Sequence, residues 1–309
     1  MGENDFYPEK PELIEKVSKK NTRNTIFSLL LFIITFSIIG SNDYTFIFYL
    51  VSVLVIHELG HFLFMKKYGY TNVKMLFIPL MGAFVEGKKE EYHQKESLIV
   101  LLAGPIPGIV VGLFLLYFGV EWKLEWMNDL AFLFLFLNIL NLLPLDPLDG
   151  GQILKLLINK SPELFQLIFS FISSLIMIGI GWYYELWLLV IFGFIMGLRV
   201  RTVQKNYLIH KELSKEKINY NTNYKQLTNK DFAKIKQFVL DFTPALRKYI
   251  GQIDEETLNP IIADQVNNIL VTPLKKNASI SFKIFVLIIW ISAFILPFIL
   301  INYLGFLKF

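Results

Sequence analysis

Residues 44–65 read YTFIFYLVSVLVIHELGHFLFM, an apolar run long enough for a helix to cross a bilayer, which takes about 20 residues. The run contains His57-Glu58-Leu59-Gly60-His61, whose two histidines are four positions apart and therefore lie on one helical face. Two imidazoles with this spacing can bind one zinc ion beside the glutamate between them. Ionisable side chains at membrane depth are energetically costly and usually functional. The run therefore predicts a membrane helix that carries half of a metal site.

The composition is typical of a polytopic membrane protein. Of the 309 residues, 54% are hydrophobic and 29 are phenylalanine, whereas soluble domains reach roughly 45–50% with glycine included. Cysteine is absent, which excludes disulfides and a thiolate nucleophile. The net charge of +4 is small, and we interpret it as loop asymmetry and not as a nucleic-acid-binding surface. The charged residues 1–24 carry no small-residue cleavage site, so we expect no cleaved signal peptide.

Seven apolar stretches are long enough to cross, or nearly cross, a bilayer. They are residues 24–40, 44–65, 97–120, 128–143, 164–182, 185–200 and 281–303. We expect six or seven spans, because 164–200 resembles two short helices joined by a tight interfacial turn. The predicted fold is an all-α polytopic membrane protein. We expect a cytoplasmic N-terminal segment at residues 1–24 and a transmembrane core at 25–200. A small, mainly helical soluble segment in the cytoplasm follows at 201–280, and a C-terminal transmembrane helix at 281–309.

The basic residues predict the orientation of these spans. With seven spans and a cytoplasmic N-terminus, all of the 30 lysines and arginines except Lys123 and Lys308 lie in cytoplasmic segments or at their flanks. This distribution follows the positive-inside rule. We therefore expect a multi-pass cell-membrane protein with its N-terminus and the His57–His61 end of the second span toward the cytoplasm.

Between the second and third spans, residues 73–87 are apolar but too short to cross the membrane. Pro79, Gly82 and Gly87 argue against a continuous helix. We predict two short strands folded as a re-entrant β-hairpin, which must be covered by protein or line a cavity.

The soluble segment 201–280 predicts two helices. Thr228, with an acidic residue three positions later, is typical of an N-cap that opens a helix running through Leu240. A second helical pattern covers residues 260–270. His93 and His210 lie in polar stretches, and we expect both to be solvated.

A hydrolytic zinc site needs a third protein ligand and an open position for water. Residues 138–151 read NILNLLPLDPLDGG, in which two prolines break a membrane helix at the expected depth of His57. Asp149 then heads a second helical run and is a candidate ligand, although a plain N-cap explains it equally well. For Asp146 the turn acid is the stronger interpretation. The two histidines could likewise be buried helix residues that hydrogen-bond to neighbours.

Together these patterns resemble the site-2 protease family of intramembrane zinc metalloproteases (peptidase M50-like). HELGH resembles the family's zinc-binding helix, and GAFV at 82–85 lies where the family has its hairpin. AGPIPG at 103–108 resembles the start of the following helix, and NLLP with LDGG at 141–151 resembles the third-ligand signature. The resemblance covers roughly residues 44–158. Asp146 departs from it, because the family usually has a proline there. No segment long enough for a PDZ domain interrupts residues 44–143.

The resemblance implies one catalytic zinc ion, bound by His57, His61 and Asp149. It also implies that Glu58 is the catalytic general base. The implied activity is hydrolysis of a peptide bond within or near a transmembrane segment of a membrane protein. Regulated intramembrane proteolysis and removal of signal-peptide remnants are both compatible with it.

Four further residues are candidates for binding a transmembrane protein or peptide substrate. The resemblance places Asn141 close to the substrate backbone, and Gly82 and Ala83 on a hairpin edge that can pair with an unwound substrate. Asn138, one turn before Asn141, could line the same cavity or make a helix–helix hydrogen bond.

Two other interpretations stay open. Ste24-type zinc proteases carry a similar motif but use a downstream glutamate as third ligand, and no such motif follows here. A non-proteolytic scaffold or metal transporter could retain a zinc site, although four histidines are few for a metal path. The expected partners are the lipid bilayer and a membrane substrate, without nucleic acid. The substrate's identity and the oligomeric state stay open.

Overall fold

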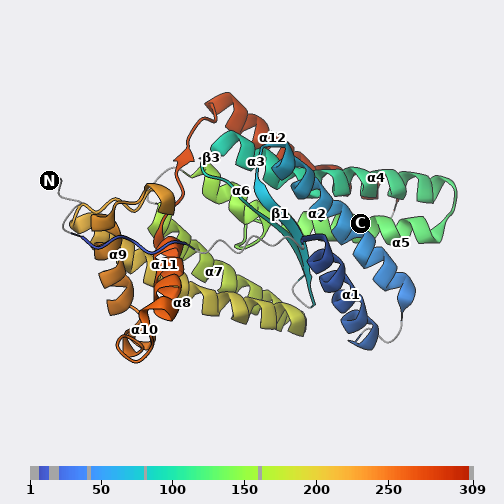
Figure 1. Ribbon diagram of the computed structural model, residues 1–309. Helices are drawn as coiled ribbons and strands as arrows, with labels where there is room; N and C mark the ends of the chain where they lie inside the picture. The colour runs from blue at the N-terminus through green and yellow to red at the C-terminus, as the bar shows by residue number, and fades with distance from the viewer. Residues whose placement is uncertain (1–6, 14–20, 40–42, 80–81, 159–161, 306–309) are drawn as a thin grey trace.

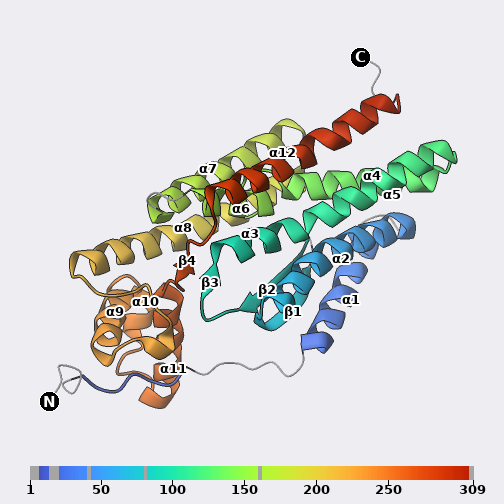
Figure 2. The same ribbon diagram turned by 90° about the horizontal axis from the view of Figure 1, so that it is seen from above.

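The protein is mainly helical, with a short antiparallel hairpin beside helix α2 (Figures 1 and 2). The computed structural model describes residues 7–13, 21–39, 43–79, 82–158 and 162–305. This architecture confirms the predicted class, a helical membrane protein with a small sheet. Its larger elements in chain order are α1 (Asn21–Ile39), α2 (Tyr44–Lys67), β1 (Thr71–Ile78), β2 (Gly82–Lys88), β3 (Tyr92–His93), α3 (Gln94–Ala103), α4 (Pro105–Glu121), α5 (Glu125–Asn141), α6 (Asp149–Leu157), α7 (Pro162–Tyr183), α8 (Trp187–Lys215), α9 (Asn229–Asp241), α10 (Pro244–Lys248), α11 (Glu255–Ile269), β4 (Leu274–Lys275) and α12 (Ile280–Tyr303).

Each of the seven predicted apolar stretches is mainly helical over its described residues. Within the described residues, four helices are long and apolar enough to cross a membrane by themselves: Tyr44–Lys67, Gln94–Glu121, Glu163–Tyr183 and Ile280–Tyr303. The tight turn expected within 164–200 lies between the end of α7 at Tyr183 and the start of α8 at Trp187. The total of six or seven spans stays a prediction.

The predicted hairpin is present. β1 and β2 pair antiparallel, with Met75 opposite Val85 and Phe77 opposite Ala83. Helix α1 holds β1 through side-chain hydroxyls, because Thr25 Oγ1 donates to the Met75 carbonyl at 2.6 Å. The backbone N–H of Phe77 also donates to Ser28, at 3.2 Å. Among the described strands β2 pairs with β1 alone, so the opposite edge of β2 has no strand partner. The depth of the hairpin in a membrane stays a prediction.

The main apolar core of the membrane part lies between α3, α4, α5, α6 and α12. Leu98, Leu116, Ala131, Leu142 and Ile153 are almost fully buried there, and Trp290 of α12 packs against them. The indole N–H of Trp290 donates to the Leu142 carbonyl at 2.8 Å. This bond ties α12 to the loop that follows α5.

The predicted soluble segment, residues 201–280, has its own apolar core, formed by the end of α8 together with α9, α10 and α11. The predicted first helix is confirmed, because α9 begins after Thr228 and the Thr228 hydroxyl accepts from the N–H of Asp231 at 3.1 Å. The second helix begins five residues earlier than predicted, since Asp254 caps α11 and Pro260 lies inside it. α8 runs through position 200 without a break.

One residue of the predicted soluble segment contradicts the sequence-based expectation, and one contact of the segment was not predicted. His210 is buried and not solvated, because its ring stacks on Tyr220 and its Nε2 lies 2.7 Å from the Ile269 carbonyl. Residues 7–13 pack on the segment, and the Lys10 ammonium donates to the Tyr224 carbonyl at 2.6 Å. Figure 1 shows this N-terminal stretch beside α9 and α11.

Candidate metal centre

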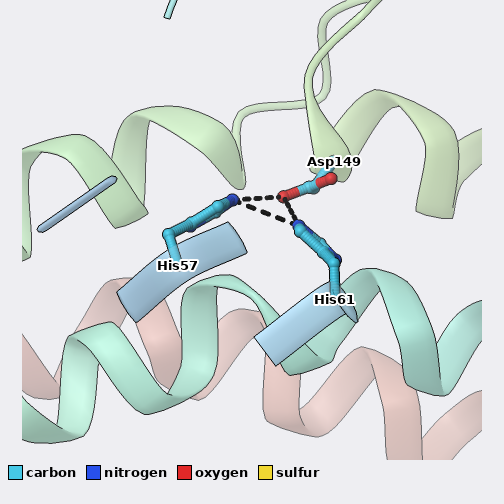
Figure 3. Close-up of side chains that lie close together, drawn as sticks. All are labelled: His57, His61 and Asp149. Atoms are coloured by element: carbon cyan, nitrogen blue, oxygen red, sulfur yellow. Dashed lines mark hydrogen bonds and ion pairs between the residues drawn. The ribbon is translucent and has the colours of Figure 1, made fainter. Parts of the chain in front are cut away.

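Three side chains from two distant parts of the chain meet in one cluster. His57 and His61 come from α2, and Asp149 is the first residue of α6. Both imidazole Nε2 atoms lie 3.2 Å from Asp149 Oδ2, and they lie 3.2 Å from each other. Figure 3 shows the three groups pointing toward one another. The predicted trio is therefore brought together with its donor atoms at the corners of an equilateral triangle.

Hydrogen bonds on the far side of each ring set the imidazole tautomers. His57 Nδ1 lies 2.8 Å from Asn138 Oδ1, and the amide nitrogen of Asn138 donates to the Phe134 carbonyl at 2.7 Å. His61 Nδ1 lies 2.8 Å from the Val100 carbonyl. Both partners are acceptors, so each Nδ1 carries the proton and donates. In the neutral rings, both Nε2 lone pairs then face the carboxylate of Asp149.

This donor set fits a metal ion. Two nitrogen lone pairs and a carboxylate oxygen converge. When the imidazoles are neutral, neither Nε2 carries a proton to donate to the carboxylate. Tetrahedral zinc with bonds of about 2.0–2.1 Å separates neighbouring ligand atoms by about 3.3 Å, which agrees with the observed 3.2 Å. Three protein ligands leave the fourth position of such a site open, as in catalytic zinc sites.

Glycines bring the helices close enough to form the cluster. A Cβ added at Gly60 would overlap the Ala103 carbonyl, and one at Gly104 would overlap the imidazole of His61. On the Asp149 side, a Cβ at Gly150 would overlap the carbonyl of Leu142. The first turn of α6 thus packs directly on the loop after α5, and Asp149 sits where the helix amides favour a carboxylate.

Glu58 lies next to the cluster. Its side chain is buried, with 4% exposure, and Oε2 has no hydrogen-bond partner among the described residues. The backbone N–H of Val85, on β2, interacts with its carboxylate. Because backbone groups alternate in direction along a strand, a Val85 N–H aimed at Glu58 points away from β1. The free edge of β2 therefore lies beside the cluster.

The remaining predicted residues occupy different positions. Asn141 ends α5, is partly exposed, and donates to the Leu137 carbonyl at 3.2 Å. Gly82 and Ala83 begin β2, and Gly82 has a φ of +97°, which favours glycine. Asn138 is fully buried behind His57. Of its two interpretations, the structure shows the helix–helix hydrogen bond, and a contact with substrate stays a prediction.

Two contacts in and near the cluster had no clear signal in the sequence. The Val100 carbonyl holds His61, and a backbone group leaves no trace in the residue type. Asp146 is buried and ion-paired to Lys155 at 2.5 Å, so it is more than a turn acid at the surface. The nine-residue spacing of this pair is a weak signal, because a loop separates Asp146 from the helix of Lys155.

Comparison with known proteins shows which family this chain resembles. Residues 45–124 match the family model described as Peptidase family M50. The resemblance to the site-2 protease family is confirmed. The part matched by the Peptidase family M50 model includes His57, Glu58 and His61 and ends before Asp149.

Curated relatives that match part of this chain come from archaea and bacteria. A zinc metalloprotease of Methanocaldococcus jannaschii is 33% identical over 144 residues, which are 44% of this chain and 41% of the relative. Stage IV sporulation protein FB of Bacillus subtilis is 32% identical over 119 residues, 36% of this chain and 39% of the relative. A putative zinc metalloprotease of Synechocystis is 34% identical over 107 residues, 33% of this chain and 28% of the relative. The chain thus matches less than half the length of each.

A solved structure is also similar. The Site-2 Protease from Methanocaldococcus jannaschii has a TM-score of 0.44 and 25% identity, over 57% of this chain and 87% of that chain.

Proposed function

We propose that the protein is an intramembrane zinc metalloprotease of the site-2 type. It hydrolyses a peptide bond within or near a transmembrane segment of a membrane-protein substrate. The convergence of His57, His61 and Asp149 beside Glu58, inside a part of the chain rich in apolar helices, is the observation that carries the proposal. The relatives named as zinc metalloproteases support the same reaction class.

In this proposal His57, His61 and Asp149 are the zinc ligands. Bound there, zinc would supply Lewis-acid activation of water and of the scissile carbonyl. Glu58 takes a proton from the attacking water and delivers it to the leaving amide nitrogen. Its burial suits this role, because a buried carboxylate lacks competing water and remains beside the reacting atoms. Asn138 and the Val100 carbonyl orient the two imidazoles, as outer partners of metal-binding histidines do.

We place the unwound substrate along the free edge of β2. The nearness of Val85 to Glu58 supports this arrangement, because a strand added there would carry its peptide bonds past the general base. A cavity of about 450 Å³ borders the same edge and is lined by Val85, Gly87, Val100 and Gln152, among others. Gly82 and Ala83 continue the edge, and Asn141 is the candidate side-chain contact to the substrate backbone.

The rival function is a scaffold or metal transporter that keeps the zinc site without proteolysis. A structural zinc site has four protein ligands, whereas three converge here among the described residues. A buried acid such as Glu58, whose Oε2 has no hydrogen-bond partner among the described residues, has no purpose in a purely structural site. These two features favour the protease.

We infer a cytoplasmic N-terminus, with residues 25–200 as a membrane core and 201–280 as a soluble segment in the cytoplasm. The distribution of basic residues supports this orientation, and it puts the metal cluster near the cytoplasmic face.

The deciding experiment compares Glu58→Gln with wild type in lipid vesicles that contain candidate transmembrane substrates. We expect Glu58→Gln to keep one zinc ion per chain and to lose cleavage by about 10²–10⁴-fold. Glu121→Gln, which changes an exposed glutamate at the end of α4, is the matched control and should cleave normally. Full activity of Glu58→Gln would refute the proposed role of Glu58. Substrates that co-purify with the inactive variant would identify the substrate class.

A further inference from the structure

Asp146 has no part in the proposed reaction. Its carboxylate is buried, with 5% of the residue exposed, and both oxygens are occupied. Oδ1 accepts from the Lys155 ammonium at 2.5 Å and from the Gln152 amide at 2.9 Å. Oδ2 accepts from the Ser170 hydroxyl. The backbone N–H of Asp146 donates to Ser173 Oγ at 3.0 Å.

These partners lie on two different helices. Gln152 and Lys155 belong to α6, the helix that begins with Asp149, whereas Ser170 and Ser173 belong to α7. Asp146 itself is in the loop between α5 and α6, three residues before Asp149. One carboxylate therefore joins the loop, the helix that carries the proposed ligand, and α7.

The other end of the same loop is also held. Trp290 of α12 donates to the Leu142 carbonyl. The backbone of this loop also lies directly against the start of α6. A Cβ added at Gly151 would overlap the Leu145 carbonyl, and one added at Gly150 would overlap the Leu142 carbonyl. The loop and the first turn of α6 are thus packed without space between them, so a movement of Asp146 moves Asp149.

Burying the Asp146–Lys155 ion pair costs free energy, which indicates that the pair serves to hold a neighbouring group in position. Taking a carboxylate and an ammonium out of water is costly, and apolar residues of similar volume often give equal or higher stability. The cost is greater among membrane helices, where charged side chains usually mark function. A metal ligand, in contrast, gains directly from a rigid supporting shell.

We propose that Asp146 is a positioning residue that fixes Asp149 toward His57 and His61. It does so by pinning the loop at 142–148 to α6 and α7. The inference rests on the proposed function, since it takes Asp149 as a zinc ligand.

The test measures how fast the full chain, in lipid nanodiscs, loses bound zinc to an excess of chelator. Asp146→Asn and the apolar double variant Asp146→Leu with Lys155→Met should lose zinc at least about tenfold faster than wild type. Lys155→Arg keeps a cation opposite the carboxylate and should lose zinc near the wild-type rate. Asp129→Asn, which changes an exposed aspartate of α5, is the matched control and should do the same.

A second readout separates positioning from folding. The midpoint of thermal unfolding, measured without zinc, should be close to wild type for the apolar double variant, because that variant leaves no unpaired buried charge. A zinc-free double variant that unfolds well below wild type would assign Asp146 a structural role and overturn the inference. So would a folded double variant that keeps zinc as long as wild type, and that result would leave the proposed protease intact. Absence of zinc from the wild type would overturn the proposed metal site itself, and this inference with it.

Discussion

The side-chain oxygen of Asn138 lies 2.8 Å from Nδ1 of His57, and this contact determines which nitrogen of the ring faces Asp149. The amide nitrogen of Asn138 is committed to the Phe134 carbonyl, so its oxygen is left to accept from the imidazole. The geometry of the His57–His61–Asp149 cluster therefore depends on a residue outside the predicted ligand set.

Asn138→Leu should weaken zinc binding by about 10–100-fold, because loss of an outer-shell partner frees the ring and its tautomer. Asn138→Asp keeps an acceptor in the same place and should bind zinc more tightly than Asn138→Leu. Competition with a fluorescent zinc chelator measures both affinities. Equal affinities of Asn138→Leu and wild type would show that His57 is oriented by other contacts.

Zinc removal should inactivate and destabilise the protein. A chelator should abolish cleavage, and added zinc should restore it. At a free zinc concentration of 100 times Kd, binding adds about 2.7 kcal/mol to the unfolding free energy, so the thermal midpoint should fall on chelation. Asp149→Ala should show no such shift, because it lacks one of the three ligands. A chelator-induced shift of the same size in Asp149→Ala would remove this residue from the ligand set.

Gly60→Ala should destabilise the fold by about 1–3 kcal/mol, which is typical of overpacking. Its added methyl would overlap the backbone carbonyl of Ala103, which cannot rotate away as a side chain could. Gly179→Ala is the matched control, because nothing lies within 4 Å of a Cβ there. It should be neutral or stabilising by about 0.5–1 kcal/mol, since alanine favours helix. Unfolding in a denaturing detergent measures both, and equal stabilities would contradict close packing of α2 on α3.

Ala83→Pro should depress cleavage of a transmembrane substrate and leave zinc content unchanged. By strand alternation with Val85, the N–H of Ala83 points to the free edge, so its loss removes a donor to substrate but none to β1. Phe84→Pro removes a donor to β1 and should instead lower the thermal midpoint. Unchanged turnover of Ala83→Pro would exclude substrate pairing at this edge.

The soluble segment should lose stability at high pH through Tyr224. Burial disfavours the phenolate and raises the pKa of Tyr224 from 10.0 to about 12. A pKa that is raised in the folded state stabilises the protein below the unfolded value, so this contribution is lost as the pH rises from about 10 to about 12. The Tyr224 hydroxyl also donates to the Pro11 carbonyl at 2.8 Å, which the phenolate cannot do.

Tyr224→Phe should therefore show a smaller decrease in thermal midpoint over this pH interval than wild type. Circular dichroism melts at each pH measure the difference. Parallel curves for the two proteins would show that the phenol is not buried in the folded state.

Local sequence rules could predict the helices of this protein and two residues of its candidate metal site, His57 and His61, whereas Asp149 was predicted from the family resemblance. Long apolar stretches form helices in a bilayer because lipid offers no partners for backbone N–H and C=O groups. The spacing of His57 and His61 places them on one face in any α-helix. The N-cap at Thr228 is equally local, because its hydroxyl satisfies an amide three residues away.

Other features depended on contacts that no local rule contains. His57 and Asn138 are 81 residues apart in the sequence. Many residues on different helices are equally far apart and never come into contact, so the separation does not predict this hydrogen bond. Lys10 lies 214 residues from the Tyr224 carbonyl that accepts its ammonium, so the packing of residues 7–13 on the soluble segment had no signal in the sequence. Asp146 has the residue type of an exposed turn, and its burial follows from the position of α7.

The sequence by itself thus determined which segments are helical and which side chains share a helical face, since both follow from periodicity and solvent. Only the tertiary structure decided which faces meet. Gly60 and Gly104 let two helices approach until His61 reaches Val100, and Gly150 and Gly151 let α6 bring Asp149 to the same point. The convergence of three lone pairs is a property of that packing, because it requires distances that only the folded chain defines.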